Sequence, residues 1–169
     1  MTLSTSAKVQ QENQQQTVEP DAAEQLIAER NTAERAVAAM LQHDHCTKEM
    51  GMQVVDVAKG SATVIMRVTQ AMLNGHSSCH GGMLFALGDS AFAFACNSEN
   101  QAAVAAGCSI EYIRPAFEGD QLTAVAQVKT QGKITGTYDV EISNQHNKLV
   151  ALFRGKSHRI GKQLVEEDI

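Results

Sequence analysis

The longest apolar run of the chain predicts a buried helix. From Gly81 to Asn97 nearly every position is hydrophobic or small, and a helix without a polar face has to be covered by protein on every side. A single carboxylate, Asp89, interrupts this run near its middle. Because burying an ionised acid costs several kcal/mol unless it is paired or faces a wet cleft, Asp89 is the first candidate for a functional side chain.

The rest of the pattern predicts a second helix and six strands. Between about residues 20 and 43 we expect one amphipathic helix, or a pair that divides at Asn31-Thr32, which buries a stripe made of Leu26, Ile27, Ala33, Val37, Met40 and Leu41. Short apolar segments bounded by turn residues predict strands at 52–57, 62–68, 102–113, 121–130, 133–144 and 148–159. Only a sheet curled around the apolar helix would cover that helix on most sides, so the fold class is α+β.

Composition narrows the class of protein further. The chain has 169 residues, a formal net charge of −5 and no tryptophan, which argues against a nucleic-acid partner. No apolar run approaches the roughly 20 residues needed to cross a membrane, and the first 20 residues lack the pattern of a secretory signal. The four cysteines are scattered, as is typical of reduced thiols, so we expect a cytoplasmic protein. The expected organisation is a disordered Gln-rich tail at 1–19, one domain at 20–161 and a C-terminal tail at 162–169.

A polar, glycine-rich loop leads directly into the apolar helix. It reads Asn74-Gly-His-Ser-Ser-Cys-His80-Gly81-Gly82, and Asp89-Ser90-Ala91 follows within the helix. This spacing resembles the Asn…His-Gly-Gly…Asp-Ser signature of the small acyl-CoA thioesterases of the hotdog fold. Ile113-Arg-Pro115 and Phe153-Arg-Gly-Lys-Ser-His-Arg159 are similar to the thioesterases of bacterial phenylacetate degradation. The resemblance, over about residues 22–161, implies a curved antiparallel sheet around a central helix, and hydrolysis of phenylacetyl-CoA or its ring-hydroxylated forms.

Thioester hydrolysis needs a polarised carbonyl and a nucleophile. The Gly81 N–H at a helix start can serve as an oxyanion donor, although a glycine pair also suits a tight turn. Asp89 is the candidate base or nucleophile, and the alternative for Asp89 and Ser90 is bracing of a neighbouring loop. The resemblance gives Asn74 a place on the nucleophilic side of the site and His80 the support of the loop and thioester end; simple loop hydrogen bonding is the alternative for both.

The spacing of these residues also predicts an oligomer. Asp89 lies eight residues beyond Gly81, which is about 12 Å along one helix, so it cannot reach a carbonyl held at the start of its own helix. Two antiparallel helices would place each Asp89 beside the Gly81 of a second subunit. We therefore expect a homodimer, and the resemblance implies that dimers pair again into a homotetramer.

The expected substrate contacts are basic and small residues. Arg154, Lys156 and His158 share one face of the last predicted strand and are candidates for the phosphates of coenzyme A, although a solvated strand face would read the same way. Arg114, Lys133 and Arg159 are further candidates, and Ser90 and Gly82 complete the expected substrate-binding set. No metal and no cofactor are expected, because coenzyme A is part of the substrate.

Three other functions remain open at this point. A metal site would draw on His76, Cys79 and His80 or on His43, His45 and Cys46, but neither group has a typical zinc spacing. A hotdog enoyl-CoA hydratase would share the fold, and release of free thiol separates it from a thioesterase. A non-catalytic acyl-CoA sensor would bind without turnover, and the chain has no basic DNA-reading helix-turn-helix to support that role.

Overall fold

The computed structural model describes residues 21–166. The expected Gln-rich tail, the expected helix start at Pro20 and the last three residues lie outside the described residues. The elements, in chain order, are α1 (Ala22–Leu41), α2 (His45–Glu49), β1 (Gln53–Ala58), β2 (Ser61–Arg67), the 3-10 helix η1 (Gln70–Met72), α3 (Gly81–Asn97), β3 (Ala103–Tyr112), β4 (Gln121–Gln131), β5 (Thr135–Ser143) and β6 (Leu149–Arg159). All six predicted strands and the apolar helix are present, within three residues of their expected ends.

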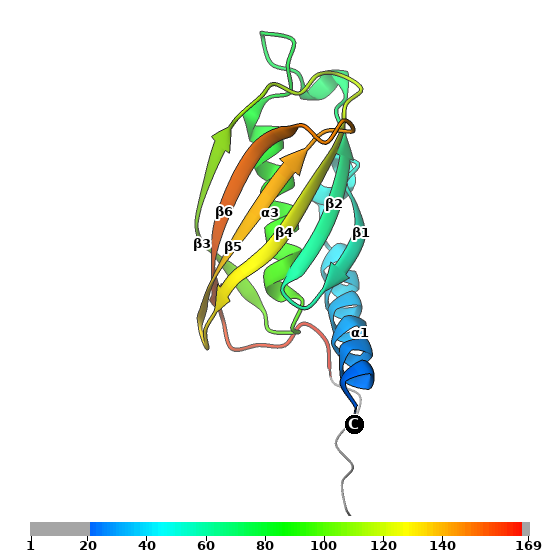
Figure 1. Cartoon of the computed structure of the whole chain (residues 1–169), viewed down its shortest axis with the longest axis vertical. Coiled ribbons are helices and arrows are strands. Elements are labelled where there is room, and N and C mark those ends of the chain that lie inside the picture. The colour runs from blue at the N-terminus through cyan, green and yellow to red at the C-terminus, as the bar shows by residue number, and fades with distance from the viewer. Residues whose placement is uncertain (1–20, 167–169) are drawn as a thin grey trace, which may run out of the picture.

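The strands form a single antiparallel sheet in the order β1-β2-β4-β5-β6-β3. The sheet curves around α3, and α1 lies beside β1 at one edge (Figure 1). The expected α+β hotdog fold is therefore confirmed. The edge at β1 contacts α1, whereas the opposite edge, β3, contacts only β6 within the sheet.

Close packing between α3 and the sheet explains two glycines. A Cβ on Gly88 would lie 3.0 Å from the side chain of Phe153, and a Cβ on Gly155 would lie 2.7 Å from the ring of Phe92. Even one extra methyl group here would force the aromatic rings to move, at a cost of about 1–3 kcal/mol. The glycines thus allow the helix and β6 to approach closely around a core of fully buried aromatic and aliphatic side chains.

The sequence predicts that α3 is covered on every side, and within the described residues this prediction is wrong. The buried residues of α3 face the sheet, but Gly82 is exposed and a stripe of residues at helical spacing is only partly buried: Phe85, Ala86, Asp89, Ser90 and Ala93. A single curved sheet encloses most of a helix but leaves one side open. Within residues 21–166, this stripe of α3 is therefore left only partly covered.

The N-terminal helix differs from its prediction in two ways. Helix α1 is continuous, without a division at Asn31-Thr32, and the side chain of Asp21 caps it by accepting the N–H groups of Ala23 and Glu24. The expected burial of Leu26 and Ile27 is wrong, since these side chains are 67% and 61% exposed. The reason is geometric: the first turns of α1 extend past the end of the sheet (Figure 1), so only the second half packs, through Ala33, Ala36 and Val37.

The segment after β6 lies against the domain. The side-chain oxygen of Asn100 accepts the N–H groups of Leu164 and Val165, both at 3.0 Å, and its amide donates to the Val165 carbonyl at 2.9 Å. Arg35 of α1 donates to the Glu166 carbonyl at 2.9 Å. These bonds join residues 162–166 to α1 and to the turn after α3. Within residues 21–166, no helix is long and apolar enough to cross a membrane.

Candidate functional site

The loop before α3 is held by the side chain of Asn74. Its Oδ1 accepts the N–H of His76 at 2.9 Å and both the N–H and the hydroxyl of Ser78 at 3.3 Å. The loop turns sharply at Ser77, whose φ of 57° lies in the left-handed region. Asn74 therefore organises this loop through its Oδ1, as the loop-bonding interpretation predicts.

The first turn of α3 has one backbone donor left without an acceptor. His80 caps the helix: its Nδ1 accepts the N–H of Gly82 at 2.9 Å, and its carbonyl accepts the N–H groups of Met83 and Leu84. The N–H of Gly81 has no acceptor among residues 21–166. The positive end of the helix dipole adds to this donor, so Gly81 is the position in the first turn where a substrate oxygen can bind.

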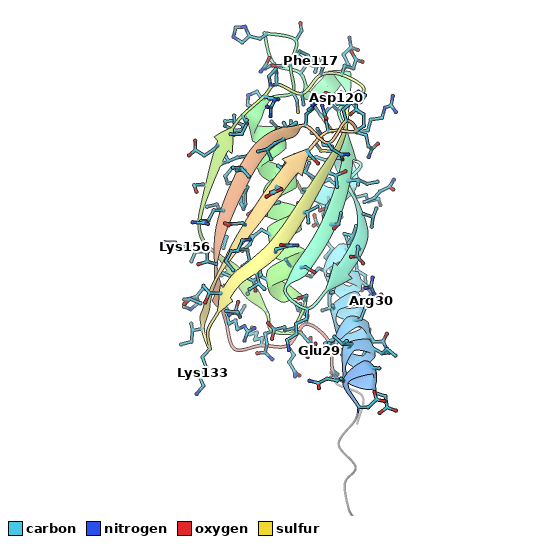
Figure 2. All side chains as sticks on the ribbon, viewed as in Figure 1. Glu29, Arg30, Phe117, Asp120, Lys133 and Lys156 are labelled. Carbon is cyan, nitrogen blue, oxygen red and sulfur yellow. The ribbon has the colours of Figure 1, made fainter. Side chains whose placement is uncertain are left out.

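A cavity of about 320 Å³ opens at this helix start. Asn74, Gly81 and Arg114 line it together with apolar groups that include Leu84, Tyr112, Ile113 and Pro115. Arg114 is anchored by a 2.7 Å hydrogen bond from its Nη1 to the Leu149 carbonyl. The structure thus brings three of the predicted site residues into one cavity. This cavity lies at the end of the molecule where Figure 2 shows Phe117 and Asp120, opposite the end that carries Lys133.

Asp89 lies about two turns further along α3, within the open stripe. Burial raises the pKa of its carboxyl group, and a hydrogen bond from the Cys108 thiol, at 3.7 Å, partly offsets this effect. Burial and the neighbouring Asp89 charge raise the pKa of Cys108 to about 11, so the thiol keeps its proton near neutral pH and donates it. No cation pairs with Asp89 among the described ion pairs. Ser90, the next residue, is also only partly buried.

The predicted basic residues of β6 lie on the outer face of the sheet, away from the cavity at Gly81. On β6 the alternation is as expected: Phe153, Gly155 and Ser157 are buried, and Arg154, Lys156 and His158 are exposed on the outer side of the sheet. Arg154 forms a two-pronged ion pair with Asp139 of β5 at 2.6 and 2.8 Å. Figure 2 shows Lys156 midway between the two ends of the molecule. The structure therefore does not bring these three residues together with Gly81 within one chain.

Two residues of β3 contact the site, and the sequence interpretation did not identify either. Cys108 contacts Asp89, and the hydroxyl of Tyr112 donates to the Gly81 carbonyl at 3.0 Å. The available signal was the alternation along β3, which places Cys108, Ile110 and Tyr112 on one side of the strand. This alternation identifies Cys108 and Tyr112 as site residues only when it is known that β3 runs beside α3.

The groups considered for a metal do not come together. Among residues 21–166, no three His, Cys, Asp or Glu side chains are arranged to hold a metal ion. Burial also raises the pKa of the Cys79 thiol, to about 11.

The hotdog domain thus carries a free helix-start N–H, a cavity beside that donor, and a carboxylate on the same helix that pairs with no described cation. Residues 76–151 match the Thioesterase superfamily. That segment contains His80, Gly81, Gly82, Asp89, Ser90 and Arg114, and it ends before Arg154, Lys156 and His158.

Known proteins extend this match over most of the chain. The acyl-coenzyme A thioesterase PaaI of Escherichia coli is 58% identical over 129 residues, which cover 76% of this chain and 92% of that protein. A solved structure of the E. coli PaaI protein superposes with a TM-score of 0.79 at 56% identity, covering 80% of this chain and 98% of that one. A putative esterase of Archaeoglobus fulgidus is 37% identical, over 76% of this chain and 84% of its own. The chain belongs to the thioesterase superfamily, and it is a thioester hydrolase.

Proposed function

We propose that this protein hydrolyses acyl-coenzyme A thioesters, and that its preferred acyl groups are phenylacetyl and ring-hydroxylated phenylacetyl. The observation that carries the proposal is the free Gly81 N–H, which opens into a cavity at the start of the helix that also holds Asp89. The identity to the acyl-coenzyme A thioesterase PaaI supports the substrate class. So does a related Streptococcus mutans structure bound to acetyl-CoA, at 28% identity and a TM-score of 0.65, covering 66% of this chain and 90% of that one.

The chemistry follows from the electrostatics of α3. The thioester carbonyl oxygen accepts the Gly81 N–H, which stabilises the negative charge that develops as the carbonyl is attacked; one such donor contributes about 10²–10³ in rate. Asp89 acts either as a base that takes a proton from water or as a nucleophile that forms an anhydride, which water then opens. In both routes the carbon–sulfur bond breaks, the electron pair leaves with sulfur, and the thiol and carboxylic acid are the products.

Two subunits are needed to build each site. Gly81 and Asp89 of one chain are separated by about 12 Å of helix, and the partly buried stripe of α3 continues onto the open edge strand β3 through the Cys108–Asp89 contact. An unpaired edge strand of small residues is a ready template for pairing with a second copy. A symmetric dimer formed there sets the Asp89 of one subunit beside the Gly81 of the other, and dimers pair again into a tetramer.

Coenzyme A binds through basic residues on the protein surface. Arg114 stands beside the cavity, and Lys156, His158 and the Asp139-paired Arg154 are exposed on the outer face of β6. Ser90 and Gly82 lie along the open side of α3, where the partner subunit closes the site. Coenzyme A enters and leaves as part of the substrate, so the proposal requires no metal and no separate cofactor.

A screen of thiol release tests the function directly. Aryl-, short-chain and long-chain acyl-CoAs are mixed with the enzyme, and free coenzyme A is measured with a thiol reagent. We expect the highest kcat/KM for phenylacetyl-CoA and its hydroxylated forms. Binding without thiol release from any of them would contradict hydrolysis and indicate an acyl-CoA sensor, and loss of an enoyl double bond without thiol release would indicate a hydratase.

Subunit mixing tests the shared site. Asp89→Asn and Gly81→Val chains are each inactive in the proposal, but a mixed dimer contains one site built from two intact halves. After exchange in equal amounts, about a quarter of the wild-type activity should return, because half of the dimers are mixed and each has one working site. If native mass spectrometry shows mixed dimers and no activity returns, Gly81 and Asp89 do not act across the interface.

A further inference from the structure

Tyr112 joins the end of β3 to the start of α3. Its hydroxyl donates to the Gly81 carbonyl at 3.0 Å, and its ring atoms lie 2.9–3.3 Å from the place where a Cβ of Gly81 would stand. The tyrosine therefore occupies the space that any larger residue at position 81 would need. A larger residue at position 81 would therefore displace the Tyr112 ring from its place beside the helix start.

The Tyr112 hydrogen bond adds to the one made by His80, and together they restrain the first turn of α3. The His80 side chain accepts the Gly82 N–H, and the Tyr112 hydroxyl donates to the Gly81 carbonyl. Both hydrogen bonds act on the peptide group between Gly81 and Gly82, which is the immediate neighbour of the Gly81 N–H. An oxyanion donor contributes most when its direction is fixed before the substrate arrives, and a glycine pair has more backbone freedom than any other dipeptide.

The ring of Tyr112 also forms part of the cavity wall. It is 53% exposed although it lies at the end of a strand next to the core, and its exposed part lines the cavity together with Leu84, Ile113 and Pro115. This wall is apolar, it contains one aromatic face, and it stands next to the donor that would hold the thioester oxygen. An aromatic ring packs on another ring with a preference that an alkyl chain does not have.

We propose that Tyr112 is both a positioning residue for the Gly81 N–H, through its hydroxyl, and the residue that selects an aromatic acyl group, through its ring. The inference rests on the proposed function and deepens it, because it names the side chain that recognises the acyl group. The two roles belong to different atoms of one side chain, so two substitutions separate them.

Tyr112→Phe removes the hydroxyl and keeps the ring. We expect kcat to fall about two- to tenfold, the usual worth of one hydrogen bond, by the same factor for phenylacetyl-CoA and for hexanoyl-CoA, with KM almost unchanged. Tyr112→Leu also removes the ring, and it should lower the phenylacetyl to hexanoyl ratio of kcat/KM by a further two- to tenfold, about the worth of an aromatic pair.

Phe117→Leu is the matched control, since Phe117 is an exposed aromatic at the same end of the molecule (Figure 2) but does not line the cavity. It should leave kcat and the phenylacetyl to hexanoyl ratio of kcat/KM unchanged. Thermal unfolding and sedimentation of each variant check that the fold and the oligomer are intact. A Tyr112→Phe variant with wild-type kcat would overturn the positioning role, and a Tyr112→Leu variant with the wild-type ratio would overturn the selecting role.

A binding measurement separates this inference from the proposed function. Calorimetry with non-hydrolysable thioether analogues of phenylacetyl-CoA and hexanoyl-CoA reports recognition of the acyl group without turnover. If wild-type protein binds both analogues but releases no thiol from the thioesters, hydrolysis is contradicted. The selecting role then depends only on whether Tyr112→Leu weakens the phenylacetyl analogue more than the hexanoyl analogue, and equal weakening would overturn it.

Discussion

Asp89 and Asp139 lie on opposite sides of the curved sheet and have opposite electrostatic surroundings. Asp139, on the outer face, accepts two hydrogen bonds from Arg154, and this cation lowers the pKa of its carboxyl group. Asp89, on the open side of α3, has a thiol as its neighbour in place of a cation, and burial raises its pKa. The Arg154 pair makes Asp139 a weaker base. Burial makes Asp89 a stronger one, and no described cation occupies its oxygens, although Oδ1 accepts the Cys108 thiol.

The largest expected difference between the two aspartates is in activity. Asp89→Asn keeps the shape of the side chain and removes the base, so kcat should fall by roughly 10²–10⁴-fold. Asp139→Asn makes the same chemical change on the outer face and should leave kcat within about twofold of wild type. Steady-state kinetics with a freshly prepared, non-deamidated sample checks both. Near-normal turnover by Asp89→Asn would contradict the assignment of Asp89 as the base or nucleophile.

Arg154, the partner of Asp139, should affect substrate binding more than the rate of the chemical step, and its effect should be smaller. Replacing Arg154 and Lys156 together with Ala should raise KM about two- to fivefold and change kcat less, because exposed charges that attract phosphates contribute modest binding energy. The rise should shrink at high salt, where surface charges are screened. The double variant Lys48→Ala, Lys162→Ala has the same change of charge and is the control. An unchanged KM at low ionic strength would show that this strand face is only solvated surface.

Cys108, the neighbour of Asp89, should influence the pH at which kcat/KM falls on the acid side. Asp89 must be ionised to act, so kcat/KM falls as the pH drops through its pKa, which burial has already raised. Cys108→Ala removes the hydrogen bond that lowers this pKa, and the acid limb of kcat/KM should therefore move to higher pH. Cys108→Ser keeps a donor and should leave the limb close to its wild-type position. Among the described residues, the titratable groups that face Asp89 are Cys108, which donates to it, and Cys96, whose pKa the Asp89 charge helps to raise. A limb that does not move in Cys108→Ala would contradict the role of the thiol.

The smallest difference should be in stability, and it should have opposite signs at the two positions. The folded-state pKa of Asp89 is raised, so its ionised form opposes folding at neutral pH, and Asp89→Asn should raise Tm there. The folded-state pKa of Asp139 is lowered, so its ionised form favours folding above its ordinary pKa, and Asp139→Asn should lower Tm slightly. Both differences should fade as the pH falls and the carboxyl groups become protonated. Thermal unfolding of the two variants at neutral and acid pH measures this, and shifts of the same sign would contradict the comparison.

Much of the fold was present in the pattern of apolar residues. The run from Gly81 to Asn97 predicted a helix packed into the core, although not its open side, and short alternating segments predicted strands, since these periods follow from backbone geometry. The motif before and within the helix was equally local, and it identified Asn74, His80, Gly81 and Asp89 as candidates. The error on α1 came from the same reasoning: apolar spacing predicted a buried stripe at Leu26 and Ile27, but spacing does not tell how far the sheet extends.

Only the tertiary structure decided which of these residues meet. Tyr112 and Cys108 are 31 and 19 residues from Gly81 and Asp89 along the chain, and the position of β3 beside α3 brings each pair into contact. The separation of Arg114, at the cavity, from Arg154, on the outer face with Asp139, likewise depends on the sheet. Site residues that lie in one helix or turn can be predicted from the sequence, because helices and turns are formed by neighbouring residues. Contacts across a sheet depend on strand order, which the sequence of each strand does not contain.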